Sequence, residues 1–112
     1  MQASSLVPGP AKRVRFNRGQ YLIIPQASGC YVISNAWDDI LYIGLSNNLR
    51  NRFEQHLDNP GKVNPTQAGV AFWFHFLIYD KKKIRKLENS WLQQFQVNEG
   101  VLPILNSIQS VG

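Results

Sequence analysis

The stretch GCYVISNAWDDILYIG, residues 29–44, decides the fold of this chain. β-Branched and aromatic residues fill its two ends, 29–34 and 40–44, and residues of these types favour strands. Between the two ends, residues 35–39 form a polar turn of hairpin length. The stretch therefore predicts two short strands that pair antiparallel.

A helix and a third strand are expected after this hairpin. Ser46 is a suitable N-cap for a helix that runs to about Leu57 and is ended by Asn59-Pro60-Gly61. Residues 62–69 are expected to form a loop. Residues 70–79 are almost entirely apolar on both alternating faces, which predicts a strand covered on both sides and therefore central in its sheet.

A second helix is expected after the central strand. Asp80 can cap it, and Asn98-Glu99-Gly100 should end it near Val97. The tail from residue 101 to residue 108 is apolar enough to pack back onto the domain.

The first twenty residues differ in composition from the rest. Residues 1–10 are rich in Ser, Pro and Gly, and the segment from Lys12 to Arg18 carries four positive charges. We therefore expect residues 1–20 to be a flexible basic arm in front of a domain over residues 21–112.

Composition bounds the class of protein. The 112 residues suffice for one domain, and a hydrophobic content of 44% is enough for a core without disulfide or metal staples. The net charge of +5 favours a polyanionic partner. Cys30 is the single cysteine, and no apolar stretch is long enough to span a membrane, so we expect a soluble cytoplasmic protein.

One acidic residue interrupts the apolar face of the second helix. That face consists of Ile84, Leu87, Trp91, Leu92 and Phe95. Glu88 lies four residues after Ile84, where the stripe would continue, and a buried carboxylate needs a cation or several donors. Two interpretations remain open: a rim position with an ion pair to Arg85, or a functional site that binds a cation.

Two polar residues lie beside the buried edge of the first helix. Arg52 and His56 are four residues apart and project along one line. The guanidinium suits a phosphate, and a histidine can transfer a proton near neutral pH. A solvated helix face is the alternative interpretation. Arg50 faces away from this line.

The two predicted hairpin strands each carry a tyrosine. Tyr31 and Tyr42 could face the same side of the sheet, although tyrosines are also ordinary half-buried strand residues.

The run Lys81-Lys82-Lys83 with Arg85 suggests a solvated face, or a phosphate contact at a helix N-terminus. His75 is interpreted as a satisfied histidine in a buried strand, because zinc-ligand spacing is missing.

Together these motifs resemble the GIY-YIG nucleases. The first motif reads Gly29-Cys30-Tyr31 here, the second reads Tyr42-Ile43-Gly44, and the resemblance extends to about Asn106. It implies a fold of the α/β class, α+β type, with a small, mainly antiparallel three-stranded sheet flanked by helices. It also implies a divalent-metal-dependent endonuclease that leaves a 5′-phosphate and a 3′-hydroxyl.

The resemblance implies roles for the candidate residues. The catalytic set would be Tyr31, Tyr42, Arg52, His56, Glu88 and Asn106. Glu88 would bind one Mg²⁺ or Mn²⁺, and Tyr42 would be the general base, with His56 as the alternative. Gly44 would let a substrate phosphate approach the backbone, and Lys81, Lys82, Lys83 and Arg85 would contact nucleic acid.

One position departs from the family pattern. The excision-repair members have a lysine immediately after the second motif, where this chain has Leu45. A noncatalytic nucleic-acid-binding module with the same fold therefore stays open, as does a protein-interaction subunit. The expected partner is nucleic acid, DNA in preference to RNA, without a membrane; a homodimer or a separate specificity subunit would supply target choice.

Overall fold

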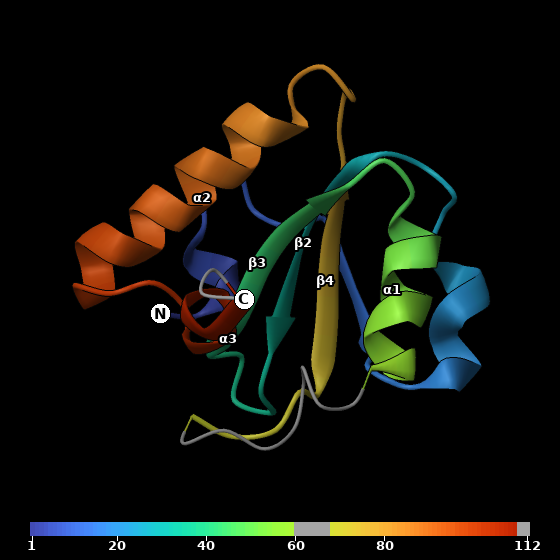
Figure 1. The fold of residues 1–112 in the computed structure, drawn as a ribbon, viewed down its shortest axis with the longest axis horizontal. Coiled ribbons are helices and arrows are strands. Elements are labelled where there is room, and N and C mark those ends of the chain that lie inside the picture. Colours follow the sequence, from blue (N-terminus) through green and yellow to red (C-terminus); the bar gives the residue numbers. More distant parts are fainter. Residues whose placement is uncertain (60–67, 110–112) are drawn as a thin grey trace.

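The structure is a computed structural model that describes residues 1–59 and 68–109, the side chains of 107–109 excepted. Its centre is an antiparallel sheet of four strands in the order β1-β4-β2-β3 (Figure 1). The strands are β1 (Lys12–Arg15), β2 (Gly29–Ser34), β3 (Ile40–Ser46) and β4 (Trp73–Ile78). The expected α+β class and antiparallel sheet are confirmed, with one strand more than expected.

The predicted hairpin is the pair β2 and β3. Gly29 lies opposite Ser46 and Tyr31 lies opposite Gly44, with an irregularity after Ile33. β3 thus continues two residues beyond its expected end, and Ser46 belongs to the strand. The predicted central strand is β4, which pairs with β1 on one side and β2 on the other.

Helices cover both faces of the sheet, with a separate apolar cluster under each helix (Figure 1). Helix α1 (Leu49–Asp58) covers the face that carries Tyr31, Phe74 and Phe76. Helix α2 (Ile84–Glu99) covers the other face, where Trp91 is fully buried. The apolar stripe that the sequence predicts for α2 is the side that meets the sheet.

The ends of the helices differ in detail from the expected ones. Asn48, not Ser46, caps α1, because its side chain accepts a hydrogen bond from the Asn51 amide. Asp80 caps a turn in front of α2 rather than the helix itself. Gly100, in the left-handed region, ends α2 after Glu99. The loop expected at 62–69 lies mostly outside the described residues.

The chain after α2 packs back onto the domain as predicted. Helix α3 (Ile104–Gln109) contacts β3, and Leu105 is buried. No helix in the described part of the chain is long and apolar enough to cross a membrane.

Residues 1–20 were expected to form a flexible arm, but the structure packs them into the domain. Ala3, in the 3-10 helix η1 (Ala3–Ser5), and Leu6 are buried in the cluster under α2. The Gln94 side chain pairs with both the N–H and the C=O of Val7. β1 then forms an edge of the sheet, and the 3-10 helix η2 (Arg18–Ile23) contacts α1. Sequence composition missed this because only three buried apolar side chains, Ala3, Leu6 and Val14, anchor this largely polar segment.

Candidate active site

Three predicted site residues meet on the α1 face of the sheet, beside strand β3. Tyr31 comes from β2, Tyr42 from β3 and His56 from α1. The ring centroids of the two tyrosines are 5.9 Å apart, and each lies 5.5 Å from the His56 ring. The prediction that both tyrosines face the same side is therefore confirmed.

Tyr31 and His56 form a buried hydrogen-bonded pair. The Tyr31 hydroxyl is 2.8 Å from His56 Nε2, and the exposed fractions of the two residues are 0% and 5%. The Tyr31 ring also stacks on Phe74 at 5.0 Å. Burial raises the pKa of Tyr31 well above its usual value, so its hydroxyl stays protonated. The pair is thus held in one arrangement and has almost no contact with bulk water.

Of the two tyrosines at the candidate site, Tyr42 is the one that solvent reaches. It is half-buried on the edge strand, and burial raises its pKa, with Glu88 adding to the rise. The neighbouring Tyr31 hydroxyl and Arg52 oppose that rise. A proton acceptor in this position needs added positive charge nearby to ionise near neutral pH.

Arg52 and Glu88 complete the site from opposite sides of the sheet. Arg52 lies on α1 and Glu88 on α2, yet the charges of both act on the pKa values of Tyr31 and Tyr42. Both side chains are partly buried. Strand β3 lies at the edge of the sheet, so side chains from α1 and α2 can converge beside it (Figure 1).

Glu88 is a partly buried carboxylate that forms no ion pair with another described residue. Burial raises the pKa of Glu88, and Arg85, one turn earlier, only partly offsets this. Within residues 1–59 and 68–109, the Glu88 carboxylate has no ion pair within 4.0 Å. The alternative interpretation of a rim ion pair to Arg85 therefore loses support.

Gly44 packs closely against the two tyrosine rings. A Cβ atom at Gly44 would lie 2.6 Å from both Cζ and the hydroxyl oxygen of Tyr31, and 2.8 Å from Cε2 of Tyr42. The absent side chain thus makes room for the two tyrosine rings. This close contact inside the protein explains the glycine without any substrate.

Asn106 acts on the backbone of the edge strand. Its Oδ1 accepts a hydrogen bond from the Ile43 N–H, and its Nδ2 donates one to the Ile43 carbonyl, both at 2.8 Å. Asn106 thereby ties α3 to β3 midway between Tyr42 and Gly44. This geometry suits a positioning residue more than a group that touches substrate.

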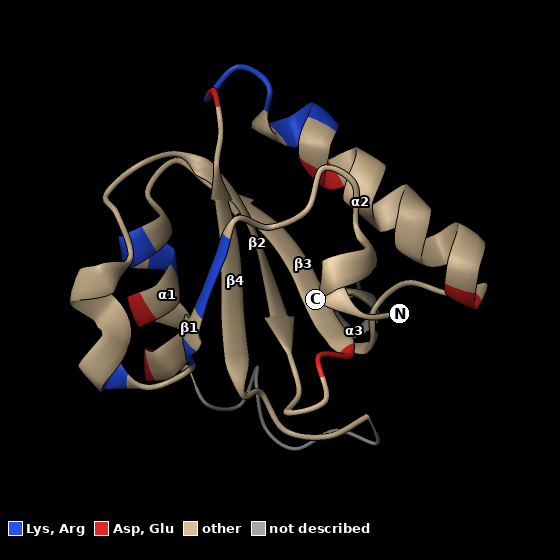
Figure 2. Ribbon diagram, turned by 180° about the vertical axis from the view of Figure 1, so that it is seen from behind, with Lys and Arg blue, Asp and Glu red and all other residues tan. Residues whose placement is uncertain are grey.

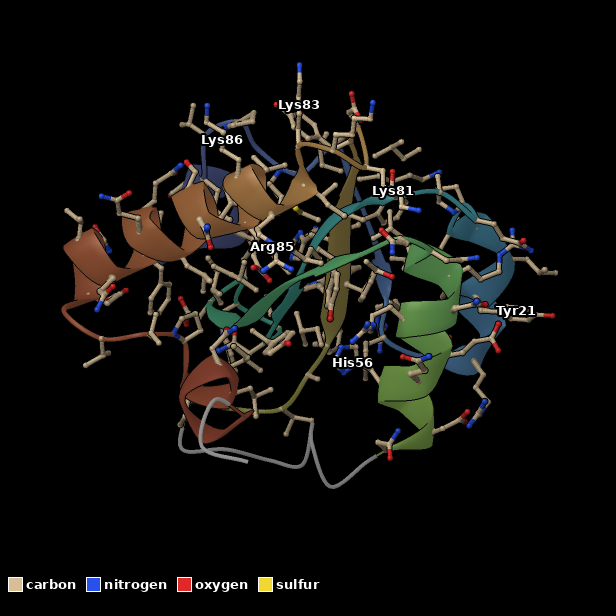
Figure 3. All side chains as sticks on the ribbon, turned by 45° about the horizontal axis from the view of Figure 1, so that its top comes forward. Tyr21, His56, Lys81, Lys83, Arg85 and Lys86 are labelled. Carbon is tan, nitrogen blue, oxygen red and sulfur yellow. The ribbon has the colours of Figure 1, made fainter. Side chains whose placement is uncertain are left out.

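The predicted basic residues lie at the N-terminal end of α2. Lys81, Lys82, Lys83 and Arg85 are all exposed. Figure 3 shows Lys81, Lys83, Arg85 and Lys86 gathered at this end, and Tyr21 on the far side of α1 from His56. These cations form a positive end of the molecule at the N-terminus of α2, the helix that carries Glu88.

Other polar residues have structural roles. Arg50 donates from Nε to the Ile24 carbonyl at 2.8 Å, which agrees with its predicted exclusion from the site. His75 Nε2 lies 2.8 Å from Ser34 Oγ, and burial lowers the pKa of His75 to about 4 although the Asp38 carboxylate opposes this. The interpretation of His75 as a satisfied histidine is confirmed.

Cys30 and Leu45 face the α2 side of the hairpin. The buried Cys30 thiol donates to the Ile84 carbonyl, with Sγ and O 3.2 Å apart, and burial raises its pKa to about 12. Leu45, opposite Cys30 in the hairpin, packs against the cluster under α2. Leu45 therefore has an apolar role on the face away from the tyrosines.

Sequence reasoning assigned the basic residues of β1 to a flexible arm and did not predict their place in the sheet. Arg13 and Arg15 lie over aromatic rings, with Cζ 3.9 Å from the ring centroids of Trp73 and Phe72 respectively. The available signal was the alternation Arg13-Val14-Arg15, with one apolar residue between two cations, which is typical of an edge strand.

Comparison with known proteins establishes the class. The GIY-YIG catalytic domain family matches residues 27–99, and the chain belongs to this family. UvrABC system protein C of Limosilactobacillus reuteri is 30% identical over 76 residues, 66% of this chain and 13% of the relative. The same protein of Acaryochloris marina is 37% identical over 84 residues, 70% of this chain and 13% of the relative. The chain thus spans about one eighth of these relatives.

A solved structure confirms the fold. The GIY-YIG N-terminal endonuclease domain of UvrC from Thermotoga maritima, bound to its catalytic divalent cation magnesium, superposes with a TM-score of 0.54. The two sequences are 18% identical, and the match covers 79% of this chain and 92% of the other. Residues 1–26, which include β1, precede the region that the family matches.

Proposed function

We propose that this chain is a divalent-metal-dependent endonuclease that hydrolyses phosphodiester bonds in DNA and leaves a 5′-phosphate and a 3′-hydroxyl. One observation carries the proposal: the rings of Tyr31, Tyr42 and His56 meet within 5.9 Å beside one edge strand, where the charges of Arg52 from α1 and Glu88 from α2 act on both tyrosines. A phosphate-binding cation, a carboxylate and a proton acceptor are the groups that metal-assisted hydrolysis needs. Family membership and the endonuclease domain of the Thermotoga maritima relative support it.

The donor set fits a hard divalent cation. The described residues contain no group of three His, Cys, Asp or Glu side chains that could hold a metal ion. Mg²⁺ does not need such a cage, because it keeps several water ligands and binds through one or two carboxylates plus substrate phosphates. The partly buried Glu88, whose raised pKa reflects an uncompensated environment, would hold one Mg²⁺ or Mn²⁺.

In the proposed mechanism, Tyr42 accepts a proton from the attacking water as the phenolate, a form that the positive charge of Arg52 favours and that a bound cation would favour further. The hydrogen bond between Tyr31 and His56 fixes the Tyr31 ring, and Tyr42 lies beside that ring. The pair therefore positions Tyr42 rather than taking part in the chemistry. Arg52 contacts the reacting phosphate and stabilises the negative charge that develops on it. When bound, the metal ion held by Glu88 would supply positive charge that offsets the negative charge of the reacting phosphate.

The cations at the N-terminal end of α2 extend the proposed substrate path. Lys81, Lys82, Lys83 and Arg85 would contact phosphates next to the scissile one and add affinity without reading sequence. Target choice from a homodimer or a separate specificity subunit stays a proposal.

Nicking of supercoiled plasmid in Mg²⁺ or Mn²⁺ tests this function, with wild type beside Glu88→Gln. Wild type should nick and stop when EDTA is added, and Glu88→Gln should keep the fold while losing nearly all cleavage and Mn²⁺ binding by calorimetry. End-labelling should detect 5′-phosphate and 3′-hydroxyl products. Unchanged Mn²⁺ affinity in Glu88→Gln would remove Glu88 from the metal site.

A noncatalytic nucleic-acid-binding module is the second candidate, and Leu45 is the observation that favours it. Leu45 is uncharged where the excision-repair members have a lysine, so this position supplies no cation that could lower the pKa of Tyr42. Salt-sensitive DNA binding without nicking in either metal would establish this alternative.

A further inference from the structure

The edge of the sheet opposite the candidate active site carries a second basic surface. We call Lys12, Arg13, Arg15 and Trp37 the β1 surface. The strand order places β1 and β3 at the two edges, with β4 and β2 between them. At the usual strand spacing, these edges are about 14 Å apart. Figure 2 shows the basic residues of β1 on the side of the molecule away from the viewer of Figure 1.

Two arginines on this surface are held in place by aromatic rings. Arg13 and Arg15 lie on the same face of β1, and their guanidinium groups sit 3.9 Å from the ring centroids of Trp73 and Phe72. Both side chains are nonetheless exposed. A guanidinium that lies over a ring has lost part of its freedom, so less entropy is lost when it binds a phosphate.

The positive charge of this surface is only partly neutralised. Arg13 lies 3.8 Å from Asp38, whereas Lys12 and Arg15 have no ion pair among the described residues. A hollow of about 250 Å³ beside Arg13 is lined also by Ser4, Lys12 and Asp38. The hollow has room for a phosphate beside Arg13, although Asp38 opposes an anion there.

Trp37 adds an aromatic side chain to these cations. It lies in the β2–β3 turn with an exposed fraction of 74%, directly before Asp38. Its backbone is fixed, because its N–H donates to the Asn35 side chain and its carbonyl accepts from Gln2 Nε2. The indole is therefore presented to solvent on an ordered turn, and an unpaired base can stack on such a ring.

The turn also connects the β1 surface with the strand of the active site. Tyr42 follows Trp37 by five residues, a span of at most about 18 Å of extended chain. A single strand that leaves the site beside β3 can thus pass around the turn to β1. A straight duplex bound at β3 cannot follow this path, because the two edges face opposite directions.

We infer that the β1 surface binds an unpaired DNA strand, with a base stacked on Trp37 and phosphates on Lys12, Arg13 and Arg15. This inference rests on the proposed function and gives it a substrate class: DNA in which a single strand adjoins a duplex, such as a flap. Lys12, Arg13 and Arg15 lie outside the part of the chain that the family matches, whereas Trp37 lies inside it, so the phosphate contacts of this surface come from the N-terminal residues of this protein.

Binding without cleavage tests the inference on the full chain. The probe is fluorescein-labelled dT20 in EDTA, and the variants are Trp37→Ala and Arg15→Gln. Trp37→Ala should weaken binding about tenfold or more, the usual effect of losing one base–aromatic stack. Arg15→Gln should reduce the salt slope by about 0.7, the value for one phosphate contact on a single strand.

Two matched substitutions control for exposed apolar area and for charge. Leu22→Ala removes an exposed apolar side chain elsewhere, and Arg18→Gln removes an arginine that is ion-paired with Asp58. Both should bind dT20 within twofold of wild type. Urea midpoints establish that every variant is folded. Equal binding of dT20 by wild type, Trp37→Ala and Arg15→Gln overturns the inference, and so does a preference for polyglutamate over dT20, which identifies an acidic protein as the partner.

Cleavage separates this inference from the proposed function. Trp37→Ala should nick plain duplex plasmid at the wild-type rate while losing any preference for a flap over a linear duplex. If wild type nicks but dT20 binding does not depend on Trp37, only the inference fails. If wild type does not nick but binds dT20 through Trp37, only the proposed function fails.

Discussion

Substitution of Gly44 by alanine tests how the site is assembled. The new Cβ would lie 2.6 Å from Tyr31 Cζ and from its hydroxyl oxygen, where carbon atoms normally keep about 3.5–4.0 Å. The Tyr31 ring cannot swing away, because it is fully buried, stacked on Phe74 and bonded to His56. A shift of about 1 Å in the ring or in the strand is therefore required.

The expected cost follows from these contacts. Overpacking of a well-packed core costs about 1–3 kcal/mol. Loss of the Tyr31–His56 hydrogen bond adds about 1 kcal/mol. Gly44→Ala should thus lower the free energy of unfolding by about 2–4 kcal/mol and the urea midpoint by about 1–2 M. A misplacement of about 1 Å beside Tyr42 should slow single-turnover cleavage by about 10²-fold.

Gly100→Ala is the matched control. Gly100 has φ of 80° with open space around its Cβ position, so alanine should cost about 1–2 kcal/mol from backbone strain and leave cleavage unchanged. If Gly44→Ala keeps the wild-type urea midpoint but weakens duplex binding, the packing argument is refuted. Gly44 would then serve the approach of a substrate phosphate, as the family resemblance implies.

Three further predictions concern residues around the same edge strand. Arg52→Ala should slow cleavage by ~10²-fold or more with little effect on DNA affinity; weaker binding with intact single-turnover cleavage would make Arg52 an anchor. Asn106→Ala should lose the two hydrogen bonds to Ile43 and destabilise the fold by about 1–3 kcal/mol, measured by urea unfolding; an unchanged midpoint would contradict its positioning role. Because burial raises the folded-state pKa of Glu88, its ionisation opposes folding as pH rises through that pKa. Metal-free Glu88→Gln should therefore melt higher than wild type at pH 7, and the difference should vanish below about pH 4; a lower melting temperature at pH 7 would contradict burial as the cause.

Local sequence patterns determined much of the fold and named the residues of the site. Runs of β-branched and aromatic residues around a polar turn predicted β2 and β3, and a run that is apolar on both faces predicted β4 as a central strand. The stripe of α2 predicted its buried side and singled out Glu88, because a carboxylate within an apolar face is costly. Arg52 and His56 were found from their spacing along one helix. Each of these signals involves residues that lie close together in the sequence.

Only the tertiary structure decided how these residues act together. Tyr31 and His56 are 25 residues apart, and Asn106 is 63 residues from Ile43, so no local pattern encodes either contact. The same holds for residues 1–20, where the buried side chains of Ala3, Leu6 and Val14 and the pairing of β1 with β4 make the expected arm part of the domain. Gly44 was predicted to matter, but its reason, the space taken by the Tyr31 ring, depends on the register of β2 against β3. Sequence specifies which groups are available, whereas packing determines which of them meet, because burial and loop closure act on the whole chain at once.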